Sequence, residues 1–239
     1  MALYIEKPRR DTCTNRPQGP DLPEILYEDE HILVCDKPCG TAVQSRRLTD
    51  PDLVSILKNH IYRSSPKGGE PYLAVIHRLD QPVRGILVFA KTPAAAKELN
   101  RQLTCHEFGK YYRALVAGRP PKKADTLEDY LVKDPRTNLS RVCGSDTRDA
   151  KLARLHYQTV SDGLHFPKVP GATELDIRLD TGRHHQIRVQ LAHMGCPIAG
   201  DTKYNPDCKD AHTWQEICLC ACRLDFCHPK THKPLQFRL

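Results

Sequence analysis

The sequence lacks several features that would place it in a common class of protein. No run of about 18 apolar residues occurs, so we expect no membrane-spanning helix and no membrane partner. Residues 1–21 carry charged residues and prolines but no apolar stretch, which argues against a secretory signal peptide and for a cytoplasmic protein. No internal repeat or low-complexity block is present. The sequence therefore has none of the marks of a membrane or secreted protein.

The eleven cysteines show none of the spacings of a strong zinc or disulfide motif. Their odd number does not suggest a secreted disulfide framework, and no Cys-x-x-Cys pair occurs. Cys218, Cys220 and Cys222 alternate along one strand-like stretch, and three residues on one strand face do not converge on a tetrahedral ion. The C-terminal Cys and His residues lack the segment of about 12 residues that lets two ligand pairs fold together. We expect packed thiols and no bound metal, with a metal- or redox-responsive protein as the alternative.

The size and charge of the chain allow one substantial domain, or two small ones, with a basic surface. The 239 residues include 36 Lys and Arg against 29 Asp and Glu, which gives a net charge of +7. Such an excess favours a polyanionic partner, although many basic proteins bind no nucleic acid. We expect residues 1–23 to form a flexible leader and residues 24–239 to form the folded domain.

The chain is organised around one stretch that spans residues 73–91. Two apolar runs, Leu73–Ile76 and Ile86–Ala90, lie on either side of a polar corner. The second run has no polar alternation, which predicts a strand buried on both faces. Proline and glycine between the runs supply turn chemistry, so the corner presents the carboxylate of Asp80 on a rigid turn at a cleft. The other polar residues of the corner are His77, Arg78 and Arg84.

Hydrophobic periodicity and turn residues predict many strands and few helices. One helix begins at Asp50-Pro51, where Asp50 caps it and Pro51 takes the first helical position, and another begins at Thr92-Pro93. Because few helices lie between strands, the pattern favours an α+β fold over a doubly wound sheet. The expected strands are Glu24–Tyr27, His31–Val34, Lys110–Gly118, Leu152–Thr159 and Thr173–Leu179, with a basic surface hairpin or arm over residues 120–144.

A second group of polar residues follows the last of these strands. The strand stops at Thr181-Gly182, and a short helix begins near His184 and closes at a glycine. A helix start offers free backbone N–H groups, and basic side chains lie beside it, so this corner is a candidate anion site. Arg183 lies at the corner, where we expect it to bind phosphate, and Arg188 lies one turn into the helix.

These two stretches resemble the motifs of the RluA family of pseudouridine synthases, enzymes that isomerise uridine to pseudouridine in structured RNA. The first stretch matches the family's His-Arg-Leu-Asp motif at His77–Asp80, with Gly85 and Ala90-Lys91 at the expected spacing. The second contains the motif Thr-Gly-Arg-x-His-Gln-Ile-Arg in full at Thr181–Arg188. Further matches are the turn Asp36–Gly40, the pattern Lys110-x-Tyr112-x-Ala114, the segment Gly195–Tyr204 and the closing strand Ile217–Thr231.

The resemblance covers about residues 24–239 and departs from the family pattern at a few positions. Asp36 replaces the Asn of the family, Val83-Arg84 replaces the common Thr-Ser, and Cys220 replaces a His. None of these positions is that of the catalytic acid. The sequence before Glu24 is too short for the small RNA-binding module that some longer relatives carry at the N-terminus.

The resemblance implies a fold, a reaction and a set of site residues. The fold is one α+β domain with a long mixed, mainly antiparallel sheet, flanking helices and a basic cleft. Asp80 is the nucleophile or base, Arg188 is the cation that keeps it ionised, and Tyr112 stacks on the uracil and assists removal of the carbon-5 proton. No step of this reaction calls for a metal or a cofactor. The residues expected to bind RNA are Arg78, Arg84, Lys110, Arg183, His185 and Gln186.

The sequence leaves the RNA and the modified uridine undetermined, because specificity lies in the surface around the cleft. We expect a monomer that acts on ribosomal RNA or tRNA. The altered Val83-Arg84 leaves a second hypothesis open, in which the chain is an RNA-binding or RNA-folding protein whose catalysis is secondary or lost. Formation of pseudouridine in a uridine-containing transcript separates these two hypotheses.

Overall fold

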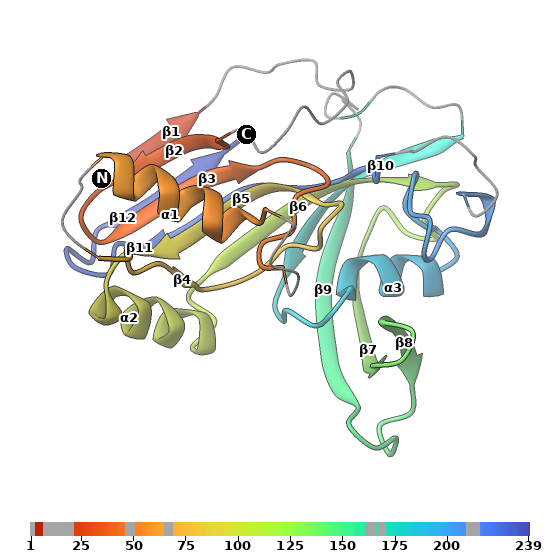
Figure 1. The fold of residues 1–239 in the computed structure, drawn as a ribbon. Coiled ribbons are helices and arrows are strands. Elements are labelled where there is room, and N and C mark those ends of the chain that lie inside the picture. The colour runs from red at the N-terminus through yellow and green to blue at the C-terminus, as the bar shows by residue number, and fades with distance from the viewer. Residues whose placement is uncertain are drawn as a thin grey trace. The chain divides into compact units, whose positions relative to one another are not determined.

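The computed structural model describes residues 3–6, 22–45, 51–64, 69–160, 166, 171–208 and 216–239 (Figure 1). The chain divides into two compact units. The first unit consists of Met1–Gly109 together with Ala221–Leu239, and the second unit consists of Lys110–Cys220. Across the described ranges, no helix is both long enough and apolar enough to cross a membrane.

The first unit is built on a mixed sheet in which most neighbouring strands are antiparallel, as the sequence predicted. The strands are β1 (Leu3–Glu6), β2 (Glu24–Glu28), β3 (Ile32–Lys37), β4 (Ala74–Val75), β5 (Arg84–Ala90), β11 (Leu219–Cys227) and β12 (Pro234–Arg238). Their order is β2-β3-β5-β11-β12, with β4 paired to β5 and β1 parallel to β12. The sequence predicted no strand in the leader, and β12 was also missed.

The buried centre of the first unit is formed by β3 and β5. Every residue of β3 is buried, and so is every residue of β5 except Arg84. This burial confirms the prediction that Ile86–Ala90 is covered on both faces. The two strands pack with Phe226 and Phe237 from the C-terminal strands. The core therefore fixes the backbone at the charged residues that end β3 and begin β5.

Two helices belong to the first unit, α1 (Leu53–Ser64) and α2 (Pro93–Thr104). The predicted start of α2 is confirmed, because the Thr92 hydroxyl accepts the Ala95 N–H at 3.1 Å. The predicted start of α1 is wrong. Asp52 supplies the capping carboxylate, which accepts the Ser55 N–H at 2.8 Å, and Pro51 precedes the helix. The apolar face sets this start, since the first helical residue is buried; Asp50 lies outside the described residues.

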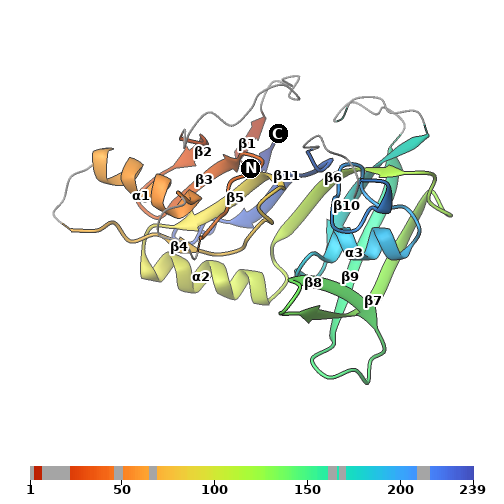
Figure 2. The same cartoon turned by 45° about the vertical axis from the view of Figure 1, so that its right-hand side comes forward.

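The second unit is an antiparallel sheet with the strand order β6-β10-β9-β7-β8. The helix α3 (Gln186–His193) packs through Val189 against Leu131 and Ala153 and lies beside β9 and β7 in both views (Figure 1, Figure 2). The pairing of β7 with β8 confirms the predicted hairpin. The strands are β6 (Gly109–Ala117), β7 (Ala124–Asp134), β8 (Leu139–Cys143), β9 (Lys151–Val160) and β10 (Ala172–Leu179).

Candidate active site

The turn that carries Asp80 lies between β4 and β5 and is bound to the turn that follows β3. The Asp80 carbonyl accepts the Val83 N–H at 3.0 Å, which closes the turn. The Gln81 carbonyl accepts the Gly40 N–H at 3.0 Å, and the Gln81 amide donates back to the Gly40 carbonyl at 3.0 Å. Leu79 and Val83 are buried, while Asp80 is half-buried. The structure thus supplies the rigid turn that the sequence predicted for this carboxylate.

A buried lysine is bonded to this turn. Lys37 has no exposed surface, and its ammonium donates to the carbonyls of Pro38, Thr41 and Gln81 at 2.9, 2.8 and 2.9 Å. Burial lowers the pKa of Lys37 to about 8, while the charge of Asp80 acts in the opposite direction. Lys37 was not among the predicted site residues. Its signal was the match of the Asp36–Gly40 turn to the Asn-Lys-Pro turn of the family.

Two of the departures from the family pattern contact each other. Arg84 donates from Nη2 to Asp36 Oδ2 at 2.7 Å and from Nε to the same oxygen at 3.2 Å. The side chains are 31% and 6% exposed, respectively, so the carboxylate is buried and the guanidinium reaches the surface. Arg84, which we predicted to bind RNA, is therefore ion-paired within the protein. Its contact with RNA stays a prediction.

The remaining residues of the first motif differ in what the backbone requires of them. Gly85 has a φ of +136°, and a Cβ at this position would collide with the backbone of Ala221 in β11. Only glycine fits at this close approach of two strands. Arg78, by contrast, is exposed to solvent. The exposure of Arg78 is what a contact with RNA phosphate requires.

The structure brings together Lys110 and Arg183, two residues that the sequence predicted to bind RNA. The Lys110 ammonium lies 3.4 Å from the position that a Cβ on Gly182 would occupy. Burial, and secondly the charge of Arg183, lower the pKa of Lys110, and Asp180 opposes this shift. Two cations that repel each other gain more from an anion than either would gain alone. This part of the second unit is therefore a candidate phosphate site.

Tyr112 lies on β6 opposite Ile177 of β10 and is buried. It shares one face of the strand with Ala114, which is fully buried, as the period of two predicted. The position fixes the ring within the second unit. The predicted stacking of this ring on uracil stays a prediction.

The corner before α3 is bound by its own side chains. The Gln186 side chain is buried, and its carbonyl oxygen accepts from the Thr181 hydroxyl at 2.8 Å and from the Arg183 N–H at 3.0 Å. The Gln186 N–H donates to the Arg183 carbonyl at 3.2 Å, and the Arg183 guanidinium donates through Nε to Leu152. Two N–H groups of this corner, those of Arg183 and Gln186, are therefore bonded within the protein, and the predicted anion site stays a prediction.

His185 precedes α3 in a left-handed conformation, with a φ of +54°. This conformation is uncommon for a residue with a side chain and indicates a constrained corner. His185 and Gln186 are both buried, and both have partners within the protein. Their predicted contact with RNA stays a prediction, and the structure favours a role in shaping the corner.

Arg188 is bound to a carboxylate that the sequence analysis did not single out. Its Nε and Nη2 donate to the two oxygens of Asp201 at 2.8 and 2.7 Å. Asp201 is 1% exposed and also accepts the Lys203 N–H at 3.0 Å. Buried bidentate pairs of this kind fix the plane of a guanidinium. The signal for Asp201 was its place in the matched Gly195–Tyr204 segment.

The predicted catalytic residues belong to both units. Asp80 lies in the first unit, and Tyr112 and Arg188 lie in the second. The predicted pairing of Arg188 with Asp80 therefore stays a prediction. The ion pair with Asp201 constrains this predicted pairing, since the buried Asp201 carboxylate already offsets the charge of Arg188.

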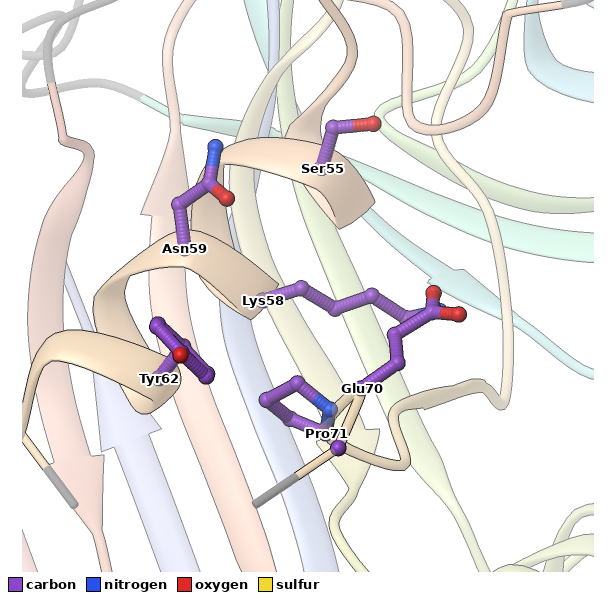
Figure 3. A pocket seen from close by; sticks show the side chains of 7 residues that line it. Ser55, Lys58, Asn59, Tyr62, Glu70 and Pro71 are labelled. Atoms are coloured by element: carbon purple, nitrogen blue, oxygen red, sulfur yellow. The ribbon is translucent and has the colours of Figure 1, made fainter. Parts of the chain in front are cut away.

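Two further features of the structure are its described cysteines and a groove beside α1. Across the described ranges, no three His, Cys, Asp or Glu side chains are grouped so that they could bind a metal ion. The ten cysteines in these ranges are free thiols, and burial raises the pKa of Cys35 to about 12, which makes that thiol unreactive. A groove of about 460 Å³ in the first unit contains none of the predicted site residues (Figure 3). In it Lys58 and Glu70 form an ion pair at 2.5 Å.

Comparison with known proteins gives consistent matches in sequence. Residues 31–193 match the family described as RNA pseudouridylate synthase. The chain is 33% identical over 242 residues to the ribosomal large subunit pseudouridine synthase D of Zymomonas mobilis, covering 98% of this chain and 73% of that protein. It is 32% identical over 229 residues to the Xanthomonas campestris protein of the same name, covering 90% of this chain and 65% of that protein.

Solved structures show the same fold. Human RNA pseudouridylate synthase domain containing 1 matches with a TM-score of 0.72 at 20% identity, over 94% of this chain and 86% of that one. Human RNA pseudouridylate synthase domain containing 4 matches with a TM-score of 0.71 at 21% identity, over 90% of this chain and 87% of that one. With the sequence matches and the motifs at His77–Asp80 and Thr181–Arg188, the chain belongs to the RNA pseudouridylate synthase family.

Proposed function

We propose that the chain isomerises uridine to pseudouridine in RNA, with Asp80 as the nucleophile or base. The observation that carries this proposal is the rigid turn that presents Asp80, within the motif that the family shares. The two relatives described above are named ribosomal large subunit pseudouridine synthases, and we propose ribosomal RNA as the first substrate to test. A tRNA is the second.

The reaction moves one bond of the sugar. The bond from the ribose to nitrogen 1 of uracil breaks, a bond from the ribose to carbon 5 forms, carbon 5 loses a proton and nitrogen 1 gains one. The uridine must first leave its stack, which costs a few kcal/mol. An ionised Asp80 is required to attack the sugar or to remove a proton from it.

Two cations have parts in this scheme. Lys37 lies within the first unit and attracts the charge of Asp80 while its own hydrogen bonds go to neutral carbonyls. Arg188 is the proposed partner of Asp80 from the second unit. Its pair with Asp201, through Nε and Nη2, holds the guanidinium in one orientation. Tyr112 is proposed to stack on the uracil and to assist loss of the carbon-5 proton.

Binding of RNA is assigned to the exposed and clustered cations. Arg78 and the pair Lys110–Arg183 are proposed to contact phosphates, and Arg84 reaches the surface while one edge of its guanidinium binds Asp36. We further propose that residues 24–239 act as one catalytic domain, in a monomer located in the cytoplasm.

The experiment is single-turnover kinetics on a ribosomal RNA transcript and a tRNA transcript, with pseudouridine mapped at each uridine. Asp80→Asn keeps the volume of the side chain and removes its charge, so we expect no detectable product and an unchanged RNA affinity. Glu70→Gln, a change in an exposed acid outside the predicted site, is the matched control and should leave the rate unaltered. A rate of one tenth of wild type or more in Asp80→Asn would contradict the assignment. RNA binding without product in the wild-type protein would favour the alternative of an RNA-binding protein.

A further inference from the structure

One aromatic residue next to Arg188 has no part in the proposed mechanism. The Cζ atom of Arg188 lies over the ring of Tyr204, 5.3 Å from its centroid. Arg188 is 3% exposed, and a cation over an aromatic face is bound more strongly when both are removed from water. Asp201 binds one edge of the guanidinium while Tyr204 covers one of its faces. The two contacts restrict different motions of the same group.

Tyr204 is itself fixed by residues of other elements. Its hydroxyl oxygen accepts the Ser140 N–H at 2.8 Å and lies 2.7 Å from Nδ1 of His185. The ring packs edge-on against His185, with 5.5 Å between the centroids, and also packs against the cluster that contains Val189. Both ends of the side chain are therefore positioned.

Ser140 connects this tyrosine to the β7–β8 hairpin. It lies on β8, is buried, and uses two groups, its N–H toward Tyr204 and its hydroxyl toward Nδ1 of His184 at 2.8 Å. His184 stacks on His185 with 3.7 Å between the ring centroids. Tyr204, whose ring lies against Arg188, therefore contacts both the β7–β8 hairpin and the corner before α3.

We propose that Tyr204 is a positioning residue for Arg188 and that Ser140, on β8, fixes Tyr204. The proposal rests on the proposed function, in which Arg188 serves Asp80. The Asp201 pair fixes one edge and the plane of the guanidinium. The Tyr204 ring lies against one face of that plane and opposes its displacement, so that the group keeps one orientation. Preorganisation of this kind acts on the rate of the chemical step and not on the affinity for RNA.

The test compares Tyr204→Phe with Tyr204→Leu. Phenylalanine keeps the aromatic face and loses the hydroxyl, whereas leucine loses the face. At saturating RNA we expect Tyr204→Leu to lower the single-turnover rate about 10- to 100-fold, and Tyr204→Phe to stay within about threefold of wild type. The dissociation constant for RNA should change less than about threefold in both. Tyr62→Leu, an exposed tyrosine on α1, is the matched control and should retain the wild-type rate.

Two results would overturn the proposal. If Tyr204→Leu reaches the wild-type rate at saturating RNA, the ring has no effect on Arg188. If Tyr204→Phe is as slow as Tyr204→Leu, the hydroxyl bond to Ser140 is what matters, and Tyr204 is only an anchor of the hairpin. Denaturant midpoints are measured for each variant, so that rates are compared among folded proteins.

A measurement of stability tests this proposal independently of the proposed function. The shift in denaturant midpoint caused by Tyr204→Leu is measured in the wild-type background and in the double variant Arg188→Met, Asp201→Asn. We expect a smaller shift in the second background, where no guanidinium lies over the ring. Equal shifts would show that the ring does not interact with Arg188. This arm needs no activity, so it stands even if the wild-type protein forms no pseudouridine.

Discussion

The two units bind the charged groups of the candidate site in different ways. In the first unit, the cation Lys37 donates only to backbone carbonyls, one of which belongs to the turn of Asp80. In the second unit, Arg188 is bound by side chains, the carboxylate of Asp201 and the ring of Tyr204. Neutral carbonyls leave the charge of Lys37 uncancelled, whereas Asp201 offsets the charge of Arg188.

This difference assigns the two cations different parts. Lys37 donates a hydrogen bond to the turn and attracts the Asp80 carboxylate that the turn carries. Its hydrogen bonds go to neutral carbonyls and not to an opposite charge. Arg188 is a neutralised and oriented donor, whose direction matters more than its net charge. The first unit therefore supplies a positive charge that attracts Asp80 and a rigid backbone turn. The second unit supplies a guanidinium with a fixed orientation. Each of the following variants removes one charged group, or its partner, from one of the two units.

The largest expected effect comes from Asp201→Asn. This change leaves the charge of Arg188 buried without its carboxylate, which costs about 3–5 kcal/mol of unfolding free energy. The measurement is chemical denaturation. The double variant Arg188→Met, Asp201→Asn is the control and should recover most of the loss, since no buried charge remains. A single variant as stable as the double would show that the pair does not depend on charge.

Lys37→Met is expected to cost about 2–4 kcal/mol. Three backbone carbonyls lose their charged donor, and each such loss costs about 1.5–3 kcal/mol before relaxation. Lys58→Met removes a half-buried ammonium paired with the exposed Glu70 and should cost less than about 1 kcal/mol. Denaturation gives both values, and hydrogen exchange of the Val83 N–H reports on the turn itself. Unaltered protection of that N–H would show that Lys37 does not fix the turn.

The pKa of Lys37 gives a prediction of pH dependence. The group has a pKa of about 8 in the folded chain and an ordinary value of 10.5. Between these values the unfolded chain binds more protons, so the contribution of Lys37 to stability rises with pH, by up to about 1.4 kcal/mol per pH unit. It is fully present above 10.5 and is lost as the pH falls through about 8. The difference in unfolding free energy between wild type and Lys37→Met, followed from pH 7.5 to about 10, isolates this slope; a constant difference would contradict the shifted pKa.

A smaller effect is expected from restoring the family pattern at Asp36 and Arg84. Arg84→Ser alone leaves the buried Asp36 carboxylate without its partner, and Asp36→Asn alone leaves the guanidinium without a charge to bind. The double variant should lie close to wild type, with a coupling of about 1–2 kcal/mol in the cycle. Additive losses would show that the two departures from the family are independent.

The smallest effect is expected from Arg183→Ala. Arg183 is exposed and lies beside Lys110, so its loss should weaken RNA binding and reduce the slope of log affinity against log salt by about 1. The rate at saturating RNA should stay near that of wild type. Binding titrations over a range of salt concentrations measure the slope. An unchanged slope would remove Arg183 from the set of phosphate contacts.

The sequence by itself determined the features that depend on residues close together in the chain. The apolar run Ile86–Ala90, the proline–glycine turn and the cap at Thr92 each carry a local signal, and the structure confirms the strand, the turn and the helix start. The two motifs also identified the family, because their residues recur at fixed spacing. Local signals fail where two starts compete, as at α1, where the buried Leu53 and not the Asp-Pro pair sets the first helical residue.

Only the tertiary structure decided which charges meet. Asp36 and Arg84 are 48 residues apart, Lys37 bonds to a carbonyl 44 residues away, and Ser140 bonds to Tyr204 across 64 residues. No periodicity relates such partners, since an ion pair or a hydrogen bond depends on which strands become neighbours and in what register. Burial then sets the energies, because a charge of the same type is inexpensive on the surface and costly inside. The charged residues of the site could be identified from the sequence. Their partners were determined by the pairing of β3 with β5 and by the packing of α3 on its sheet.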